Sequence, residues 1–270
     1  MKNLTFPFQR LPGFLTLLLA VAYCTTGWAV PYNAVFDVDP TKSSLTVQVN
    51  AQGFSDTDTQ QLDGTINATF DFGGYIFGST ADVTIPSASI TSTANFHLSL
   101  GLPPLLGVAI TASDLVASVS TDLPPVVMNR APTSDIQYTV SAARFPVTVN
   151  QGTIKSTGFI NQTNNLADSP VTGTSPADSM ASLVFSVDTT SGRYRQLNAT
   201  LNLPIDFTDS FTTDSGVVVD LHLTATVVAT ASFNAGLNGD FDADGDVDGR
   251  DFLLWQRDPG IGDLASWQAN

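Results

Sequence analysis

Twelve residues near the C-terminus, from Asp240 to Asp251, have the composition and spacing of a calcium-binding loop. Aspartate occupies loop positions 1, 3, 5, 9 and 12, glycine occupies position 6, and a β-branched residue occupies position 8. Ca²⁺ takes about six to eight oxygen ligands at roughly 2.4 Å, so acidic side chains must converge from one tight loop. Gly245 permits the sharp turn. The expected calcium ligands are Asp240, Asp242, Asp244, Asp246 (through its main-chain carbonyl), Asp248 and Asp251.

The alternative for this segment is a solvated acidic linker, because blocks of like charge are usually disordered. A linker does not require glycine at position 6, an apolar residue at position 8 and aspartate at position 12 together. Two features depart from a standard EF-hand loop. Position 12 is aspartate where an EF-hand has the longer glutamate, and residues 227–239 have the pattern of a strand and a loop instead of an entering helix.

Residues 240–257 resemble a dockerin-type calcium-binding repeat, as found on secreted planctomycete-type proteins. Such repeats carry this loop, end it in aspartate and follow it with one short helix, here residues 252–257. The segment DFLLWQ at 251–256 recurs in similar form as DLASWQ at 263–268, without a second aspartate-rich loop between the two. The resemblance implies a dockerin-like module over residues 236–270 that binds one Ca²⁺ and docks to a cohesin-like or other surface protein. Gly249 and Arg250 replace the Ser-Thr pair that many dockerins use to grip cohesin, which leaves the docking partner open.

The first 29 residues have the pattern of a cleaved signal peptide. Lys2 and Arg10 precede a short apolar run, and Gly27-Trp28-Ala29 fits a small-x-small cleavage site. Cleavage after Ala29 removes Cys24, the single cysteine of the chain, and so predicts a mature protein without disulfides. The sequence thus predicts bacterial export, a secreted or cell-surface location and no transmembrane segment.

The charge of the chain is strongly acidic. It carries 25 acidic residues, all of them aspartate, and 10 basic residues, for a net charge of −15. Loss of Lys2 and Arg10 with the signal leaves 8 basic residues against 25 acidic ones, or −17. Such a balance excludes nucleic acid as a partner held by charge.

Residues 30–235 predict one all-β domain. The absence of glutamate and the abundance of threonine and valine disfavour helices. Apolar residues alternate with polar ones over long runs, one of which comprises Leu197, Ala199, Leu201, Leu203, Ile205 and Phe207. The pattern predicts about ten to twelve antiparallel strands in a β-sandwich or a wide β-barrel, with no helix before residue 251. Residues 161–178 are predicted to form a long exposed loop.

No catalytic constellation is found in the domain. His97 and His222 are isolated in alternating strands, and Asp71, Asp122 and Asp206 are candidate glycosidase carboxylates that the sequence does not pair. Tyr75, Phe77, Tyr138 and Tyr194 are available for a sugar-binding platform. The stretch from Phe36 to Val47 is similar to the opening strand of YceI-like proteins, and Ser89-Ile-Thr91 with His97-Leu98 loosely matches a later stretch, which implies an apolar lipid cavity.

The leading hypothesis is an exported, calcium-binding, non-enzymatic surface or matrix protein. Its tail would mediate docking, and its β-domain would bind or build extracellular material. The first alternative is a carbohydrate-binding or carbohydrate-active component of a polysaccharide-degrading assembly, and the second is a YceI-like lipid carrier.

Overall fold

The structure is a computed structural model that describes residues 31–72, 77–102, 106–133, 135–158, 161–188, 194–212, 216–237, 239–242, 246–261 and 264–268. The predicted signal peptide, residues 1–29, lies outside the described residues. Within the described residues, fourteen antiparallel strands form one sheet, which confirms the predicted all-β class. They are β1 (Tyr32–Val38), β2 (Ser44–Ala51), β3 (Phe54–Asp71), β4 (Thr80–Ser92), β5 (Phe96–Leu102), β6 (Leu106–Val119), β7 (Val126–Arg130), β8 (Ile136–Ser141), β9 (Val147–Gly158), β10 (Gln162–Asn165), β11 (Val171–Gly173), β12 (Met180–Asp188), β13 (Tyr194–Thr212) and β14 (Val218–Leu237).

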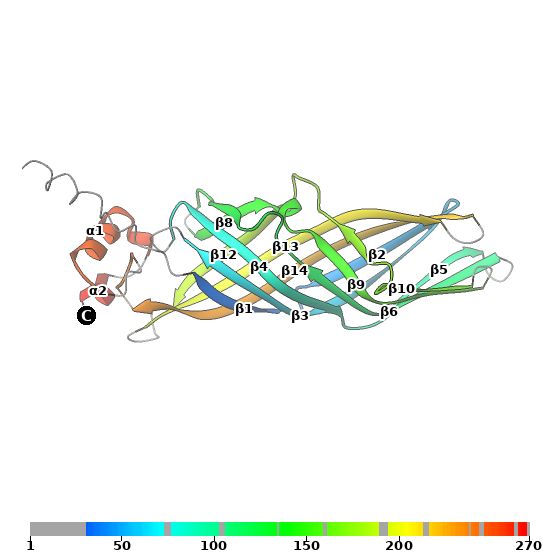
Figure 1. The fold of residues 1–270 in the computed structure, drawn as a ribbon, viewed down its shortest axis with the longest axis horizontal. Helices are drawn as coiled ribbons and strands as arrows, with labels where there is room; N and C mark the ends of the chain where they lie inside the picture. The colour runs from blue at the N-terminus through cyan, green and yellow to red at the C-terminus, as the bar shows by residue number, and fades with distance from the viewer. Residues whose placement is uncertain are drawn as a thin grey trace, which may run out of the picture.

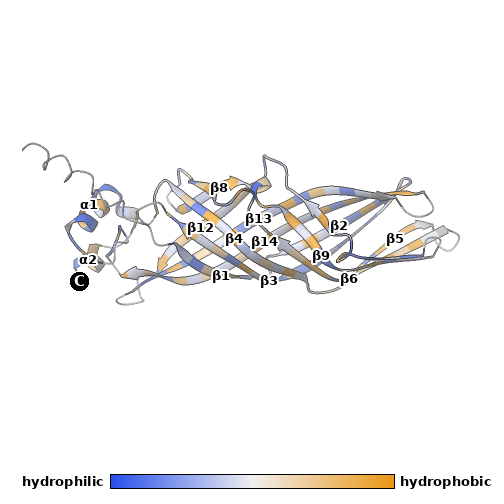
Figure 2. Cartoon of the chain, in the orientation of Figure 1, coloured by the Kyte–Doolittle hydropathy of each residue, from blue (hydrophilic) through white to orange (hydrophobic). Residues whose placement is uncertain are grey.

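The strands follow the alternation of the sequence. Along β14, buried and exposed side chains alternate over almost the whole length, from Val219 to Ala235. Figure 2 shows the same alternation of hydrophobic and hydrophilic residues along the long strands. One face of each long strand therefore enters a common core, as expected for antiparallel sheets with one wet face.

The sheet closes on itself because β1 and β2 together occupy a single strand position. Both pair with β3 on one side and with β14 on the other. The break between them, residues 39–43, is bridged by Ser43, which is 2 % exposed. Its hydroxyl donates to the carbonyl of Val228 and accepts the Val228 N–H, so this part of β14 keeps its partners. The ring runs β1/β2, β3, β4, β7, β8, β12, β13, β14 and back, and is barrel-like.

A second interruption of this kind lies beside β6, because β4 and β5 pair with different parts of the same side of β6. On its other side β6 pairs with β9, which in turn pairs with β10 and β11. The predicted exposed loop at 161–178 is therefore partly wrong, because β10 and β11 lie within it. Leu166 and Ser175 are buried there. Polar edge strands such as β10 lack the alternation that would have revealed them.

Aromatic rings fill the ring of strands at the end nearer the C-terminal tail. Phe185 lies at the centre of this cluster. Ring centroids lie 5.4–6.4 Å from that of Phe185 for Phe70, Phe72, Phe77, Tyr138 and Phe233. The Tyr138 hydroxyl donates to the carbonyl of Gly78 at 2.8 Å, which satisfies the one polar group of the cluster.

The molecule is elongated, with the tail at one end and the β5–β6 hairpin at the other (Figure 1). The tail contains α1 (Gly249–Arg257), the 3₁₀ turn η2 (Pro259–Ile261) and α2 (Leu264–Gln268), and the body adds one 3₁₀ turn, η1 (Ala142–Arg144). Helix α1 begins at Gly249, three residues before the predicted helix start at Phe252. The reason is that Asp248, which belongs to the loop, caps the helix. No helix among the described residues is long and apolar enough to cross a membrane.

Candidate calcium site

Asp251 holds the two halves of the predicted loop together. Its side chain is fully buried, and Oδ1 accepts the N–H groups of Phe241 at 2.6 Å and Asp242 at 3.1 Å. Oδ2 accepts the N–H of Asp248 at 2.8 Å. The carboxylate expected at loop position 12 therefore also organises the backbone on both sides of the turn.

Asp248 caps the N-terminus of helix α1. Its Oδ1 accepts the N–H of Arg250 at 2.7 Å, and together with Asp251 it forms a capping box. The indole Nε1 of Trp267 donates to the Asp248 carbonyl at 2.6 Å, so α2 is tied to the start of α1. Phe252 packs between Trp255 and Trp267, with centroids 6.0 Å and 5.0 Å away. The two short helices, whose sequences resemble each other, thus pack together through these three aromatic rings next to the loop.

The carboxylates converge in two overlapping groups. One group is Asp240, Asp242 and Asp251, and the other is Asp246, Asp248 and Asp251; within each, one oxygen per residue lies within 4.8 Å of the others. Oxygens that bind one ion at about 2.4 Å are at most about 4.8 Å apart, so this donor set fits a hard cation such as Ca²⁺. Asp244 lies outside the described residues.

Asp246 differs from its expected role in one respect. The loop pattern predicts that it offers its main-chain carbonyl, whereas the structure brings its carboxylate into the second group. Within the first group, Asp240 and Asp242 are buried, being 3 % and 7 % exposed. Arg250, which is largely exposed, reaches Asp242 with Nε 3.0 Å from Oδ2.

Sequence reasoning missed Arg195, the cation beneath the loop. Its side chain is 1 % exposed, Nη2 donates to the carbonyl of Asp240 at 2.7 Å, and the guanidinium lies 5.1 Å from the ring centroid of Phe241. Burial lowers the pKa of Arg195, while the charges of Asp240, Tyr32 and Asp251 raise it. The signal was present in the sequence, because Arg195 precedes Leu197 and Ala199 on the inward face of β13.

A backbone irregularity places Arg195 under the loop. Tyr194 pairs with Leu237 and Gln196 with Asn234, so β14 has one extra residue opposite Arg195. Gly236, at φ +91°, accommodates this bulge. Tyr32 borders the same place, and burial raises its pKa to about 12, with Arg195 opposing the shift and Asp240 adding to it.

The remaining candidates of the body do not form a catalytic set. His222 Nε2 lies 2.7 Å from Asp206 Oδ1 on the outer face, while His97 lies on β5. Asp122 lies 3.7 Å from Arg144, and Asp71 pairs across the sheet with Asp82. Burial raises the pKa of Asp82, and the charge of Asp71 adds to the shift.

Two of the four rings considered for a sugar-binding platform are not exposed. Phe77 and Tyr138 are fully buried in the aromatic cluster. Tyr75 and the side chain of Tyr194 lie outside the described part of the chain. Both rings point inward near the tail end of the barrel and are therefore part of the core.

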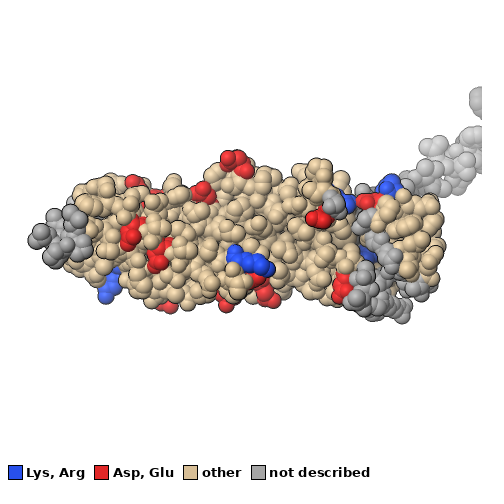
Figure 3. Space-filling view, turned by 180° about the vertical axis from the view of Figure 1, so that it is seen from behind, with Lys and Arg blue, Asp and Glu red and all other residues tan. Residues whose placement is uncertain are grey.

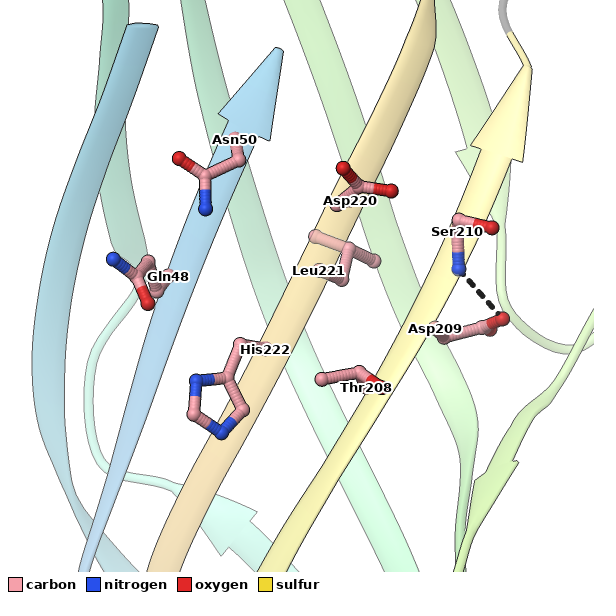
Figure 4. Close-up of a pocket in the computed structure, with 8 residues that line it drawn as sticks. All are labelled: Gln48, Asn50, Thr208, Asp209, Ser210, Asp220, Leu221 and His222. Carbon is pink, nitrogen blue, oxygen red and sulfur yellow. Dashed lines mark hydrogen bonds between the residues drawn. The ribbon is translucent and has the colours of Figure 1, made fainter. Parts of the chain in front are cut away.

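A polar groove lies on the outer face of β2, β14 and β13 (Figure 4). It has a volume of about 540 Å³ and is lined by Gln48, Asn50, Thr208, Asp209, Ser210, Asp220, Leu221 and His222. Amide, hydroxyl, carboxylate and imidazole groups are available there, and no lysine or arginine contributes to this lining. Figure 3 shows that basic side chains are also few on the face seen from behind, where acidic ones are spread along the body.

Comparisons with known proteins give no family. No family model matches the chain, and no curated protein matches it. Among solved structures, the chain is similar to the crystal structure of Ail, the attachment invasion locus protein of Yersinia pestis, in complex with the heparin analogue sucrose octasulfate. The identity is 8 %, the match covers 73 % of this chain and 97 % of that one, and the TM-score is 0.22. A likeness at that level carries no functional argument.

Proposed function

We propose that this protein is an exported, non-enzymatic surface or matrix protein whose C-terminal module binds one Ca²⁺ through the loop from Asp240 to Asp251. The observation that carries the proposal is the position of Asp251, which is fully buried and shared by both carboxylate groups. The signal-peptide pattern of residues 1–29 supports export.

The electrostatics of the loop favour a bound cation. Buried carboxylates lose hydration, and several of them in one loop repel one another unless a cation compensates. The loop brings together five described carboxylates, those of Asp240, Asp242, Asp246, Asp248 and Asp251, with Arg250 paired to Asp242. A divalent ion would reduce the repulsion among them, and its binding free energy would contribute to folding of the tail.

Docking would use the outer side of the tail. Leu253 is 64 % exposed on α1, next to the half-buried rings of Phe252 and Trp255. Aromatic and leucine side chains of this kind are typical anchors of protein interfaces. The partner would be a cohesin-like or other surface protein that recognises α1 only after Ca²⁺ has ordered the loop.

The test of the calcium proposal is isothermal titration of the mature chain, residues 30–270, with CaCl₂ after removal of metal by a chelator. Binding of one ion per chain is expected, and Asp251→Ala should weaken it at least tenfold because Asp251 belongs to both groups of candidate ligands. Asp168→Asn, an exposed aspartate of the body, should bind as the unchanged chain does. Absence of any calcium-dependent heat or fluorescence change would refute the proposal.

The groove favours a second candidate function, which is carbohydrate binding by the body. A sugar offers many hydroxyls, and the groove offers amides, hydroxyls and carboxylates that hydrogen-bond to them. Its acidic lining favours a neutral glycan over an anionic one. A glycan array with the mature chain tests this, and binding that survives both His222→Ala and Asn50→Ala would place the sugar elsewhere. The YceI-like alternative gains no support from the described residues, since side chains fill the tail end of the barrel.

A further inference from the structure

The described residues on either side of the junction between body and tail show no exposed linker. Strand β14 ends at Leu237, and Asp240 and Phe241 are already buried, at 3 % and 1 % exposed. Phe241 and Ile261 belong to the same hydrophobic core as the strands of the barrel. A free docking module would instead be separated from its body by an exposed polar stretch.

Two arginines of the body form contacts with the tail. Arg195 Nη2 donates to the Asp240 carbonyl at 2.7 Å, and its guanidinium lies under the Phe241 ring. Arg130, at the end of β7, donates from Nη1 to Asp258 Oδ2 at 2.9 Å and to the Phe77 carbonyl at 2.8 Å. These contacts reach both the first residue of the calcium loop and the segment after α1.

We infer that the calcium loop is an intramolecular cap of the barrel, so that Ca²⁺ bound in the tail stabilises the β-body through Arg195. The inference rests on the proposed calcium binding and adds its consequence for the body. When the ion orders the loop, the Asp240 carbonyl and the Phe241 ring are held over the buried guanidinium. Without the ion, repulsion among the carboxylates works against the same contacts, and a buried arginine that loses its partners is costly.

The chain provides separate reporters for its two parts. Of its three tryptophans, Trp28 is removed with the predicted signal peptide, and Trp255 and Trp267 both lie in the tail. Tryptophan fluorescence of the mature chain therefore follows the tail alone. Far-UV circular dichroism is dominated by the strands and follows the body.

The experiment is thermal unfolding of the mature chain with both reporters, in chelator and in Ca²⁺ at about 100 times its Kd. We expect coincident transitions in each condition and an upward shift of both midpoints by about 5–10 °C with Ca²⁺. In Arg195→Met, fluorescence should still respond to Ca²⁺, while the midpoint of the body should move by less than about 2 °C. Arg144→Gln, which removes an arginine from an exposed pair with Asp122, should behave as the unchanged chain does.

Each outcome decides the inference. If Ca²⁺ shifts the fluorescence transition but not the dichroism transition of the unchanged chain, the tail is an independent module and the inference fails, while calcium binding stands. If Arg195→Met keeps equal shifts in both reporters, Arg195 does not carry the coupling. If neither reporter responds and titration shows no binding, the proposed function fails and this inference fails with it. Should Arg195→Met not fold, the two-reporter result of the unchanged chain and of Arg195→Lys still decides between a cap and a free module.

Discussion

Asp58 accepts the main-chain N–H of His97 through Oδ2 at 2.7 Å, so a side chain takes the place of a backbone carbonyl between β3 and β5. Asp56 does the same for Ser99 at 2.6 Å. The first half of β3 and the strand β5 are thereby joined by carboxylates. These contacts hold the β5–β6 hairpin against the body at the end opposite the tail.

Asp58→Asn should destabilise the body by about 0.5–1.5 kcal/mol, since the side chain is partly exposed and loses a charge-assisted bond. Burial raises the pKa of Asp58, but hydrogen bonds from His97, Gln60 and Thr59 outweigh it and leave the pKa below its usual value. The stabilisation by the ionised Asp58 is therefore fully present above the pKa that Asp58 has in the unfolded chain. It is lost as the pH falls through the lower pKa that Asp58 has in the folded protein. Urea unfolding at neutral and at acidic pH checks this. If acidification destabilised the Asp58→Asn variant and the unchanged chain equally, the prediction would be contradicted.

Arg130→Met should loosen the tail without unfolding the barrel. The pair with Asp258 is partly exposed, at 22 % and 40 %, so we expect a loss of about 1 kcal/mol or less. Hydrogen exchange should accelerate in α1 and η2 and stay unchanged in β13. Unaltered exchange throughout the tail would show that Arg130 does not hold it.

Tyr32 should make the tail end of the barrel sensitive to alkali. Burial raises its pKa to about 12, while the phenol of an unfolded chain ionises near pH 10. The neutral phenol therefore stabilises the fold fully below pH about 10, and this contribution is lost as the pH approaches about 12. Between pH about 9 and about 11, the free energy of unfolding of Tyr32→Phe should fall by about 1–2 kcal/mol less than that of the unchanged chain. Urea unfolding at the two pH values measures this difference. Identical losses would argue against it.

Gly64→Ala should be among the most damaging single changes in the body. Gly64 has φ +140°, and an added Cβ would overlap the carbonyl oxygen of Ser89 on the paired strand β4. We expect a loss of more than about 3 kcal/mol from backbone strain and the displaced strand. Gly53→Ala is the matched control, because φ is +86° and nothing lies within 4 Å of its Cβ position. That variant should lose only about 1 kcal/mol. Thermal melting of the two variants makes the comparison.

The sequence indicated the strands well because each depends on a local pattern. The alternation from Leu197 to Phe207 needs no knowledge of its partners, and β13 follows it. Closure of the ring depends instead on Ser43 and on pairings between β14 and the first two strands, far apart in the chain. Periodicity carries no information about such pairings.

The candidate site divides in the same way. The spacing from Asp240 to Asp251 predicted a loop in which carboxylates converge, and the described members do so. The loop pattern says nothing about what lies beneath it. Arg195 is 45 residues away in sequence from Asp240, and only the fold brings the two together.

Strand β14 connects directly to the tail and pairs with β13 from Val218 to Leu237 and with β1 and β2 on its other side. A partner that pulled on the tail would apply force along this strand's own axis. Its ladders on both sides would then be strained in shear and share the tension, whereas a terminal hairpin would open one bond at a time. A load on the tail would thus pass through β14 to the strands on both of its sides.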